Sequence, residues 1–278
     1  MLRRVGVIPK GKSFFDQILL NESIIAILEK GPSNSRVITQ GAELTPEVQK
    51  LWAELYAEIF DQEPWNEGIV IVDDQGNFFY DSNGHPLTLG SKQLGFTSLE
   101  ELKQALVDEP QRIRNVIISL FPFLQDLDFS FSIYPQEDKI SENLKNLFHL
   151  GIKPALTLWP QDRAQAVFLS SIISGPNLRA FLIRAYTEEP VLCAAIREFF
   201  SSEERLNQNI LYLDTIGISP NCGGLGRVRF IHEHTRYHVA RACINQPRPE
   251  LVMAWSKIGT LTVPGLKAAG MSIIYPPQ

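Results

Sequence analysis

The chain has 278 residues, of which 44% are hydrophobic and 10% aromatic, enough for one large domain, or two of ordinary size, with a full core. Its net charge of −5 argues against a dedicated nucleic-acid-binding protein, and the 21% of charged residues is typical of a soluble globular chain. No segment reaches the ~20 apolar residues that a membrane helix needs, so no membrane partner is expected.

The cysteines and the first residues indicate a reducing compartment. Cys193, Cys222 and Cys243 are widely spaced and form no CxxC pair, so neither a disulfide framework nor a zinc cage is indicated. The segment from Pro9 to Lys12 interrupts the apolar run that a secretory signal would need. A cytoplasmic location is therefore the expectation.

The first 35 residues are expected to form a prelude to the main fold. The apolar segment from Val5 to Ile8 predicts a short strand, and Phe14 to Lys30 predicts a helix that ends at Gly31-Pro32. Arg36 to Thr39 then predicts the first strand of the main unit.

The clearest helix of the sequence is predicted from Pro46 to Asp61. Thr45 is a favourable N-cap residue, and the proline follows it at the first helical position, where its missing N–H is not needed. Leu51, Leu55 and Ile59 recur with the spacing of one helical face. The aromatic residues of this helix are interpreted as core packing.

The middle of the chain, about residues 68–160, alternates short strands and helices. Asp73-Asp74-Gln75-Gly76 is interpreted as the turn of a hairpin, and not as an acid–base pair. The apolar run from Ile113 to Leu124 fits a helix or a strand. The remaining predicted elements are a helix over 97–107, a strand over 129–134, a helix over 141–150 and a strand over 155–159. The region is either a large insertion or a second, degenerate repeat of the main unit.

Two apolar segments follow on either side of a Ser-Gly-Pro-Asn sequence. Ala166 to Ile173 and Leu178 to Tyr186 are predicted to pair as an antiparallel hairpin across that turn. Pro190 to Phe200 is predicted to be a helix.

The segment from Ile210 to Arg227 carries the strongest functional signal. It begins as a buried strand rich in branched residues, which Ser219-Pro220-Asn221 ends. Three glycines follow, Gly223, Gly224 and Gly226, and a helical pattern opens at about Arg227. A strand, a glycine turn and a helix together aim free backbone N–H groups at an anion. A strand over 251–258, a short helix over 263–269 and a strand over 271–275 are predicted after it.

Two sequence motifs resemble those of the GNAT superfamily of N-acetyltransferases. The segment Asn221-Cys222-Gly223-Gly224-Leu225-Gly226 is similar to the acyl-CoA-binding motif of that family, with asparagine where arginine or glutamine is usual. Far upstream, the helix from Pro46 and the segment Glu63 to Glu67 after it resemble the first helix of the family and its exit.

The resemblance implies an α/β fold. A mixed, mostly antiparallel sheet flanked by helices is expected, with an N-terminal extension or insertion added to the GNAT-like unit. The implied division places the first helix and the insertion or repeat in residues 1–160, and the acyl-CoA-binding region in residues 161–278.

The resemblance also implies acetyl-CoA as the acyl donor. The family parts two parallel strands so that the pantetheine pairs with the freed edge, and Ile216 and Ile218 occupy the corresponding positions. The backbone of Gly223, Gly224, Leu225, Gly226 and Arg227, beside Asn221, would hold the pyrophosphate. The alternative is a structural strand–helix turn that binds no ligand.

Asp214 is the candidate general base. It is a lone charge inside an apolar strand, where burial raises the pKa of a carboxyl group, and strict alternation places it on one face with Tyr212 and Ile216. The alternative role is structural. The family usually places its general acid, a tyrosine, four residues before a closing glycine, where this chain has Leu266 before Gly270. The resemblance therefore leaves the acid unassigned.

Three of the five histidines lie between His232 and His238. His234 and His238 are four residues apart on a predicted helix and could share a metal ion, but the HExxH order is missing. A solvent-exposed helix face is the favoured interpretation of this cluster.

Three functions follow from these observations. The first is transfer of an acetyl group from acetyl-CoA to a primary amine of a small molecule or a protein. The second is an inactive acyl-CoA-binding or protein-interaction module on the same fold. The third, less favoured, is a metal-dependent enzyme that uses the histidines. A homodimer is compatible with the sequence.

Overall fold

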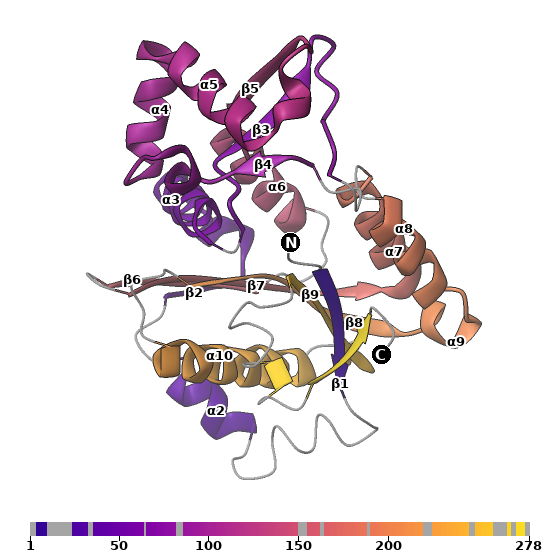
Figure 1. Ribbon diagram of the computed structural model, residues 1–278. Coiled ribbons are helices and arrows are strands. Elements are labelled where there is room, and N and C mark those ends of the chain that lie inside the picture. Colours follow the sequence, from indigo (N-terminus) through magenta and orange to yellow (C-terminus); the bar gives the residue numbers. More distant parts are fainter. Residues whose placement is uncertain are drawn as a thin grey trace.

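The computed structural model describes residues 4–9, 24–32, 36–63, 65–81, 86–149, 155–161, 164–187, 190–218, 224–244, 248–257, 266–267 and 271–275 (Figure 1). The described chain is α/β, with a seven-stranded sheet and a three-stranded sheet. All strand pairings in both sheets are antiparallel except one. The predicted class, a mixed and mostly antiparallel sheet flanked by helices, is confirmed at this level.

The large sheet contains the first and the last strands of the described chain side by side. Its strand order is β10 (Met271–Tyr275), β1 (Arg4–Pro9), β9 (Leu251–Lys257), β8 (Asn209–Ile218), β7 (Ala164–Ser174), β6 (Ala155–Gln161) and β2 (Arg36–Ile38). The pairing of β8 with β9 is the parallel one. The expectation of an N-terminal prelude is wrong for β1, because this strand pairs on both edges inside the sheet.

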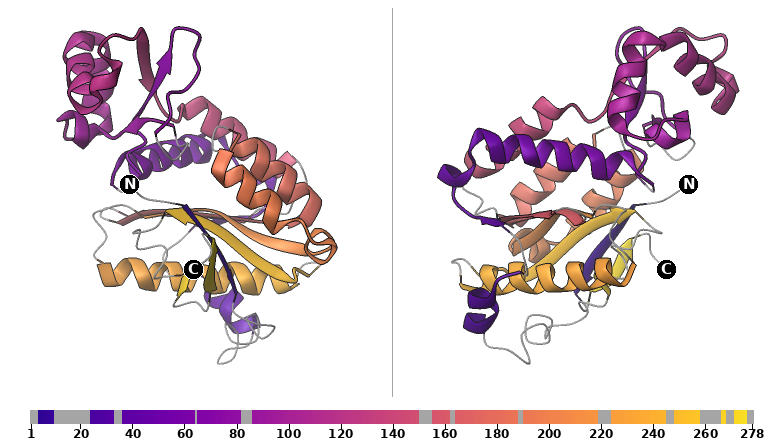
Figure 2. Two further views of the ribbon diagram at one scale, coloured as in Figure 1. Left: turned by 45° about the vertical axis from the view of Figure 1, so that its right-hand side comes forward. Right: turned by 90° about the vertical axis from the view of Figure 1, so that its left-hand side faces the viewer.

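Helices cover both faces of the large sheet (Figures 1 and 2). On one face lie α3 (Pro46–Asp61), α6 (Glu137–His149), α7 (Gly175–Ala185), α8 (Pro190–Phe199) and the short α9 (Glu203–Leu206). On the other face lie α10 (Gly224–Ile244) and, beneath it, α2 (Ile24–Lys30). The face under α3 and the face under α10 therefore have separate hydrophobic cores.

The predicted helix from Pro46 to Asp61 is confirmed as α3. The Thr45 side chain caps it by accepting a hydrogen bond of 3.4 Å from the Val48 N–H. Its apolar face is buried against β7 and α6, through Val48, Trp52, Leu55 and Ile59 among others. A short 3-10 turn, Gly41–Glu43, connects β2 to this helix.

Residues 69–133 form an insertion with a core of its own. Its sheet has the order β4 (Thr88–Leu89), β3 (Ile69–Asp73) and β5 (Phe129–Ile133). The 3-10 turns Ser91–Leu94 and Pro122–Leu124 and the helices α4 (Leu99–Asp108) and α5 (Pro110–Leu120) cover it. The run from Ile113 is mainly helical, because Pro110 opens a helix and buried apolar residues then recur one turn apart.

Asp73 has a role in a turn, as predicted. Its carboxylate accepts hydrogen bonds of 2.9 Å from the Gln75 N–H and 2.8 Å from the Asn77 N–H. The Asn77 side-chain amide donates a third bond, of 2.9 Å. Together these bonds lower the pKa of the carboxyl, and the side-chain bond from Asn77 has the largest effect. The aspartate therefore closes the turn after β3.

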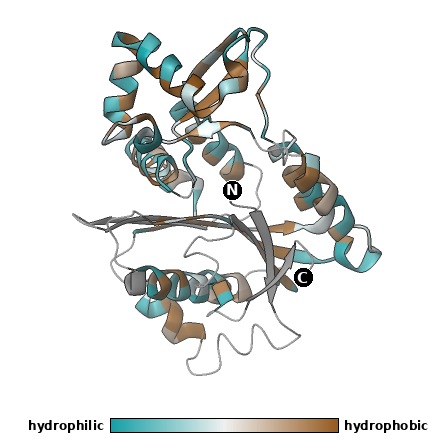
Figure 3. Cartoon of the chain, viewed as in Figure 1, coloured by the Kyte–Doolittle hydropathy of each residue, from teal (hydrophilic) through white to brown (hydrophobic). Residues whose placement is uncertain are grey.

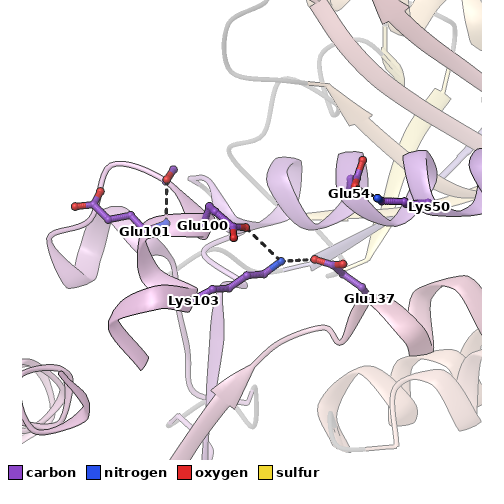
Figure 4. Close-up of polar contacts among 7 residues, drawn as sticks. Lys50, Glu54, Glu100, Glu101, Lys103 and Glu137 are labelled. Atoms are coloured by element: carbon purple, nitrogen blue, oxygen red, sulfur yellow. Dashed lines mark hydrogen bonds and ion pairs between the residues drawn. The ribbon is translucent and has the colours of Figure 1, made fainter. Parts of the chain in front are cut away.

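Two polar contacts hold the insertion to the rest of the molecule. Asp61, 1% exposed at the end of α3, accepts hydrogen bonds from the Ser91 N–H, at 2.8 Å, and from the Ser91 hydroxyl. The Lys103 ammonium of α4 contacts Glu137 of α6 and lies 3.9 Å from Glu100 (Figure 4). The first contact is buried, so it contributes more than the half-exposed second one.

The predicted hairpin after residue 166 is not formed. Leu178 to Tyr186 is not a strand paired with β7, because residues 175–185 form the helix α7. Ser174 has the extended conformation of an N-cap residue, and a proline lies in the first turn. Leu178 and Leu182, one helical turn apart, are both fully buried. A short apolar run by itself does not distinguish these two structures. The helix predicted next is confirmed as α8.

The helices that flank the sheet and the insertion are amphipathic. Hydrophilic and hydrophobic residues alternate around α3, α5 and α8 in Figure 3, and the buried residues of each belong to one of the cores. Among the described residues, no helix combines the length and the apolar character needed to cross a membrane.

Candidate functional site

Strand β8 is irregular at Asp214. Its neighbour β7 pairs Leu169 with Thr215 and Ser170 with Leu213, so Asp214 is the extra residue of a β-bulge. A bulge interrupts the alternation of side chains between the two faces of a sheet. The position of the only charged residue of β8 is therefore set by a local irregularity.

The bulge corrects the predicted face of Asp214. Leu213 and Ile216 both belong to the core under α10, although strict alternation would place them on opposite faces. A Cβ at Gly217 would instead contact Ile59 of α3, on the other face. The predicted common face of Asp214 and Ile216 is thus wrong, whereas Tyr212 is close enough to Asp214 to influence the pKa of its carboxyl.

Burial raises the pKa of Asp214 to about 6, and hydrogen bonding from Thr215 and Tyr212 opposes part of the shift. The Thr215 hydroxyl lies 3.3 Å from the carboxylate. The side chain retains partial exposure, so it is within reach of solvent. A carboxyl group in this state is mostly ionised at pH 7 to 8 and can still accept a proton.

The parallel strands β8 and β9 separate at the bulge. Their pairing runs from Ile210 with Leu251 to Leu213 with Ala254 and ends there. β8 continues to Ile218, and β9 continues to Lys257 with β1 as its partner on the far edge. Within the described residues, the β9-facing edge of β8 beyond Leu213 therefore has no strand partner, and it offers backbone groups to a ligand.

Helix α10 follows this free edge and begins at Gly224, one turn earlier than predicted. Leu225 and Gly226 belong to its first turn, whereas Asn221 and Gly223 lie outside the described residues. Arg227 is half-buried in this turn, and Arg229 is exposed and pairs with Glu233 at 2.8 Å. The N–H groups of the first turn give a 21-residue helix a positive end.

A strip of polar side chains crosses β7 and β8 on the face that carries α3 and α7. We call Ser171, Tyr212, Asp214 and Thr215 the polar strip. To one side of it, Leu169 belongs to the core under α3, and to the other side, Ile173 belongs to the core under α7. The strip therefore lies between two hydrophobic cores.

Ser171 is a member of the polar strip whose hydrogen bonds are incomplete. Its side chain is 3% exposed, and its hydroxyl has no hydrogen-bond partner in the described part of the chain. It lies directly opposite Tyr212 on the neighbouring strand. A buried hydroxyl without a partner is unfavourable in a stable core, which indicates that a ligand or water completes its hydrogen bonds.

Aromatic and acidic residues surround Tyr56 of α3 near the strip. Burial raises the pKa of Tyr56 well above its usual range, and the charges of Glu67, Asp214, Tyr186 and Tyr134 add to that effect, in decreasing order. Each of these groups is an acid. The phenol consequently stays protonated at all physiological pH values and is available as a hydrogen-bond donor.

The prediction of an exposed histidine face is wrong for two of the three histidines. His234 and His238 are each 1% exposed, and both stack on the Phe168 ring. His238 Nδ1 is 2.6 Å from the Ser170 hydroxyl. Burial lowers the pKa of His234 to about 3 and that of His238 well below its usual range. These rings are neutral parts of the core under α10.

The described residues also bear on two further expectations, a metal site at the histidines and a general acid. They contain no group of three or more histidine, cysteine, aspartate or glutamate side chains able to hold a metal ion. Leu266 is fully buried in the core under α10, so it has a packing role at the position where the resemblance implies a tyrosine acid.

Sequence reasoning did not identify Ser171 and Tyr56 as residues of the candidate site. The consecutive Ser170 and Ser171 inside an apolar strand were a usable signal, because buried serines need partners. Tyr56 was interpreted only as core, because its spacing places it beside the apolar face of α3.

No family model, curated protein or solved structure matches this chain.

Proposed function

We propose that the protein is an acetyl-CoA-dependent N-acetyltransferase with a GNAT-like sheet. The observation that carries the proposal is the parallel pair β8 and β9, which separates after Leu213 and Ala254 and is followed by a helix that begins at Gly224. The resemblance implies these features at this place in the chain. The order of the other strands and of α3 around the large sheet supports it further.

The free edge of β8 suits acetyl-CoA, the acyl donor. The pantetheine arm of acetyl-CoA contains two amide groups, which would pair with the backbone at Ile216 and Ile218 as a substitute strand. The pyrophosphate would contact the N–H groups of Gly224, Leu225 and Gly226, with Arg227 supplying positive charge. Backbone groups make most of both contacts, so a motif that departs from the family at Asn221 can still provide them.

Asp214 is the proposed base. An alkyl ammonium with a pKa near 10.4 must lose a proton before it can attack, and the carboxylate at the bulge would accept it. The amine nitrogen then forms a bond to the thioester carbonyl carbon, and the carbon–sulfur bond breaks. The new C–N nitrogen loses a second proton as the amide forms, the departing sulfur takes up one proton, and one proton in net is released to solvent.

The second candidate is an acyl-CoA-binding module without turnover. The burial of Leu266 favours it, because this side chain cannot protonate the departing sulfur. It predicts binding of CoA with the same contacts and no release of free thiol with any amine. The two candidates thus differ in one measurement, thiol release in the presence of an amine panel.

Donor binding can be tested with a matched pair of variants at the first residue of α10. In Gly224→Asp the added carboxylate interacts favourably with the helix N-terminus but repels the pyrophosphate. Gly224→Asn adds a side chain of nearly the same size without the charge. Calorimetry should give a CoA affinity at least about 10-fold weaker for Asp than for Asn, equivalent to about 1.4 kcal/mol. No heat with the unmodified protein at millimolar CoA would remove the donor assignment.

A further inference from the structure

The insertion carries the net charge of the whole molecule. Residues 69–133 contain nine acidic and four basic side chains, a net charge of −5, whereas the other residues contain 22 of each sign and are neutral together. Figures 1 and 2 show the insertion projecting beyond α3, on the side of the large sheet opposite α10. A projecting acidic body attracts basic partners, and it repels nucleic acids, anionic lipids and a second copy of itself.

Strand β5 is an edge of the sheet in the insertion, because β3 is its only partner strand among the described residues. On β3, the Ile71 N–H donates a 3.0 Å hydrogen bond to the Leu87 carbonyl, and the Ile71 carbonyl accepts one of 3.1 Å from the Phe79 N–H. Both backbone groups of Ile71 therefore point away from β5. Phe131 lies opposite Ile71, so its own N–H and C=O point away from β3, toward what we call the outer edge of β5.

Arg114 of α5 marks the beginning of the outer edge. Its guanidinium donates hydrogen bonds to the Phe129 carbonyl at 2.7 Å and to the Leu127 carbonyl at 3.3 Å, and it lies 3.9 Å from the centroid of the Phe129 ring. Beyond it, the outward N–H and C=O groups of Phe131 and Ile133 have no partner among the described residues. β5 contains neither a charged residue nor a proline, which protect many edges, so it can accept a further strand.

The turn before β5 presents apolar side chains next to the outer edge. We call residues 120–127 the apolar turn. Leu124 is fully buried in the core of the insertion and fixes the turn there. The exposed apolar side chains of the turn are Leu120, Phe123 and Leu127, with exposed fractions of 46%, 57% and 42%. Apolar side chains grouped on a surface in this way are typical of an interaction site.

Acidic side chains lie at the same end of β5. Asp126 and Asp128 are exposed just before the strand, and Asp73 of β3 lies opposite the first residue of β5, with the exposed Asp74 after it. The Arg114 guanidinium also lies there, but two carbonyls and an aromatic ring already engage it. The four aspartates leave this end negative, which suits lysine or arginine side chains of an added strand.

We propose that the insertion binds an extended segment of a partner protein, in which basic and apolar residues alternate, as a strand added to β5. The backbone of the segment pairs with Phe131 and Ile133. Its basic side chains face the aspartates, and its apolar side chains pack on the apolar turn. The net charge of the insertion selects this occupant over a second copy of the chain. This role is independent of the acetyl transfer proposed above.

The test uses the full chain and labelled seven-residue peptides. In the first, lysine and valine alternate; in the second, glutamate replaces lysine. Fluorescence anisotropy at low salt should show binding of the lysine peptide alone, weakening as the salt concentration rises. Two further lysine peptides carry backbone N-methyl groups on every valine or on every lysine. Only one of these sets of N–H groups can face β5, so their Kd values should differ by about 10-fold or more.

Hydrogen exchange locates the contact on the protein. The bound lysine peptide should slow exchange of the Phe131 and Ile133 N–H groups, measured by mass spectrometry with fragmentation to single residues. The N–H groups of Ser130 and Ser132 point toward β3 and serve as an internal control, because the peptide should leave their exchange rates unchanged.

Variants test the charge and the apolar turn. Replacing Asp126 and Asp128 together by asparagine should raise the Kd of the lysine peptide by about 5-fold or more. Asp108→Asn combined with Glu109→Gln removes two charges at the other end of α5 and should change the Kd by less than about 2-fold. Phe123→Ser should weaken binding as well, because the apolar contact is lost. All of these side chains are exposed, and thermal melts check that each variant is folded.

Several results would overturn the inference. Absence of binding at millimolar lysine peptide removes the site, and equal Kd values for the two methylated peptides remove strand addition. Protection of Phe131 and Ile133 that grows with the concentration of the protein alone, together with a dimer in sedimentation, makes a second copy the occupant. Binding to phosphatidylcholine vesicles that Phe123→Ser abolishes makes a lipid surface the occupant. None of these measurements involves acetyl-CoA, so each outcome leaves the transferase to its own test.

Discussion

Replacement of Asp214 by asparagine changes stability and turnover in opposite directions. Burial raises the pKa of this carboxyl from 3.8 to about 6, so the folded protein prefers the protonated form. The stabilising effect of that preference is complete below pH 3.8 and is lost as the pH rises through about 6. At pH 8 the ionised carboxylate therefore makes the folded state less stable than a neutral side chain of the same shape would.

The magnitude follows from the difference of about 2 between the two pKa values. It corresponds to about 3 kcal/mol as an upper bound, because the side chain keeps partial contact with solvent. Asp214→Asn should thus raise the free energy of unfolding at pH 8 by about 1–3 kcal/mol, or Tm by roughly 2–10 °C. The difference should shrink as the pH falls and be nearly gone below pH 3.8, where the aspartate is mainly protonated in the folded and the unfolded chain.

Two assays on the same preparations check this reasoning. Thermal melts of wild type and Asp214→Asn between pH 4 and pH 8 give the stability difference. Thiol release gives turnover, which should fall by about 10²–10⁴ while the affinity for CoA stays the same, because the carboxylate acts on the amine. The turnover of wild type should rise with pH through about 6. A variant that is less stable at pH 8 and loses CoA binding would refute the base and show a structural carboxylate.

Three further predictions concern the framework around the site. Burial lowers the pKa of His234, so below pH 6.5 the unfolded chain binds a proton that the folded chain excludes, and the free energy of unfolding should decline. The denaturation midpoint of His234→Phe should therefore be reduced less at pH 5 than that of wild type. Asp61→Asn should lower the free energy of unfolding by about 1.5–3 kcal/mol, because the bonds from Ser91 lose their charged acceptor, and a denaturation midpoint that stays constant would contradict this. Gly217→Ala should cost about 1–3 kcal/mol, because the added methyl group meets Ile59 at 3.0 Å; an unchanged Tm would show that α3 can move away.

Elements with strong local signals could be predicted from the sequence. The helix α3 has its cap, its proline and its apolar spacing within one short segment, and the buried strand β8 has a continuous apolar run. The sequence of α7 has a similar apolar run, which favoured a strand, and only its packing under α8 settles the helical alternative. Local patterns are sufficient where all of their signals agree, and insufficient where burial decides.

The candidate site could be predicted only in part, because it depends on pairing between distant strands. Asp214 stood out as a charge in an apolar strand, but its bulge depends on the register with β7, which no local pattern encodes. Ser171 becomes notable only when its hydroxyl is seen to be buried without a partner among the described residues.

The position of β1 has a consequence for the order in which the chain can assemble. Val7 pairs with Ala254 on one side and with Ile273 on the other, so β1 is separated from both of its partners by most of the described chain. Contacts of such long sequence separation form slowly, and they cannot form during most of translation. Until β1 docks, β9 exposes an unpaired edge of the kind that promotes aggregation. We therefore expect the nascent protein to need protection at this edge, and insertions beside β1 to disturb folding more than insertions within the turn after β3.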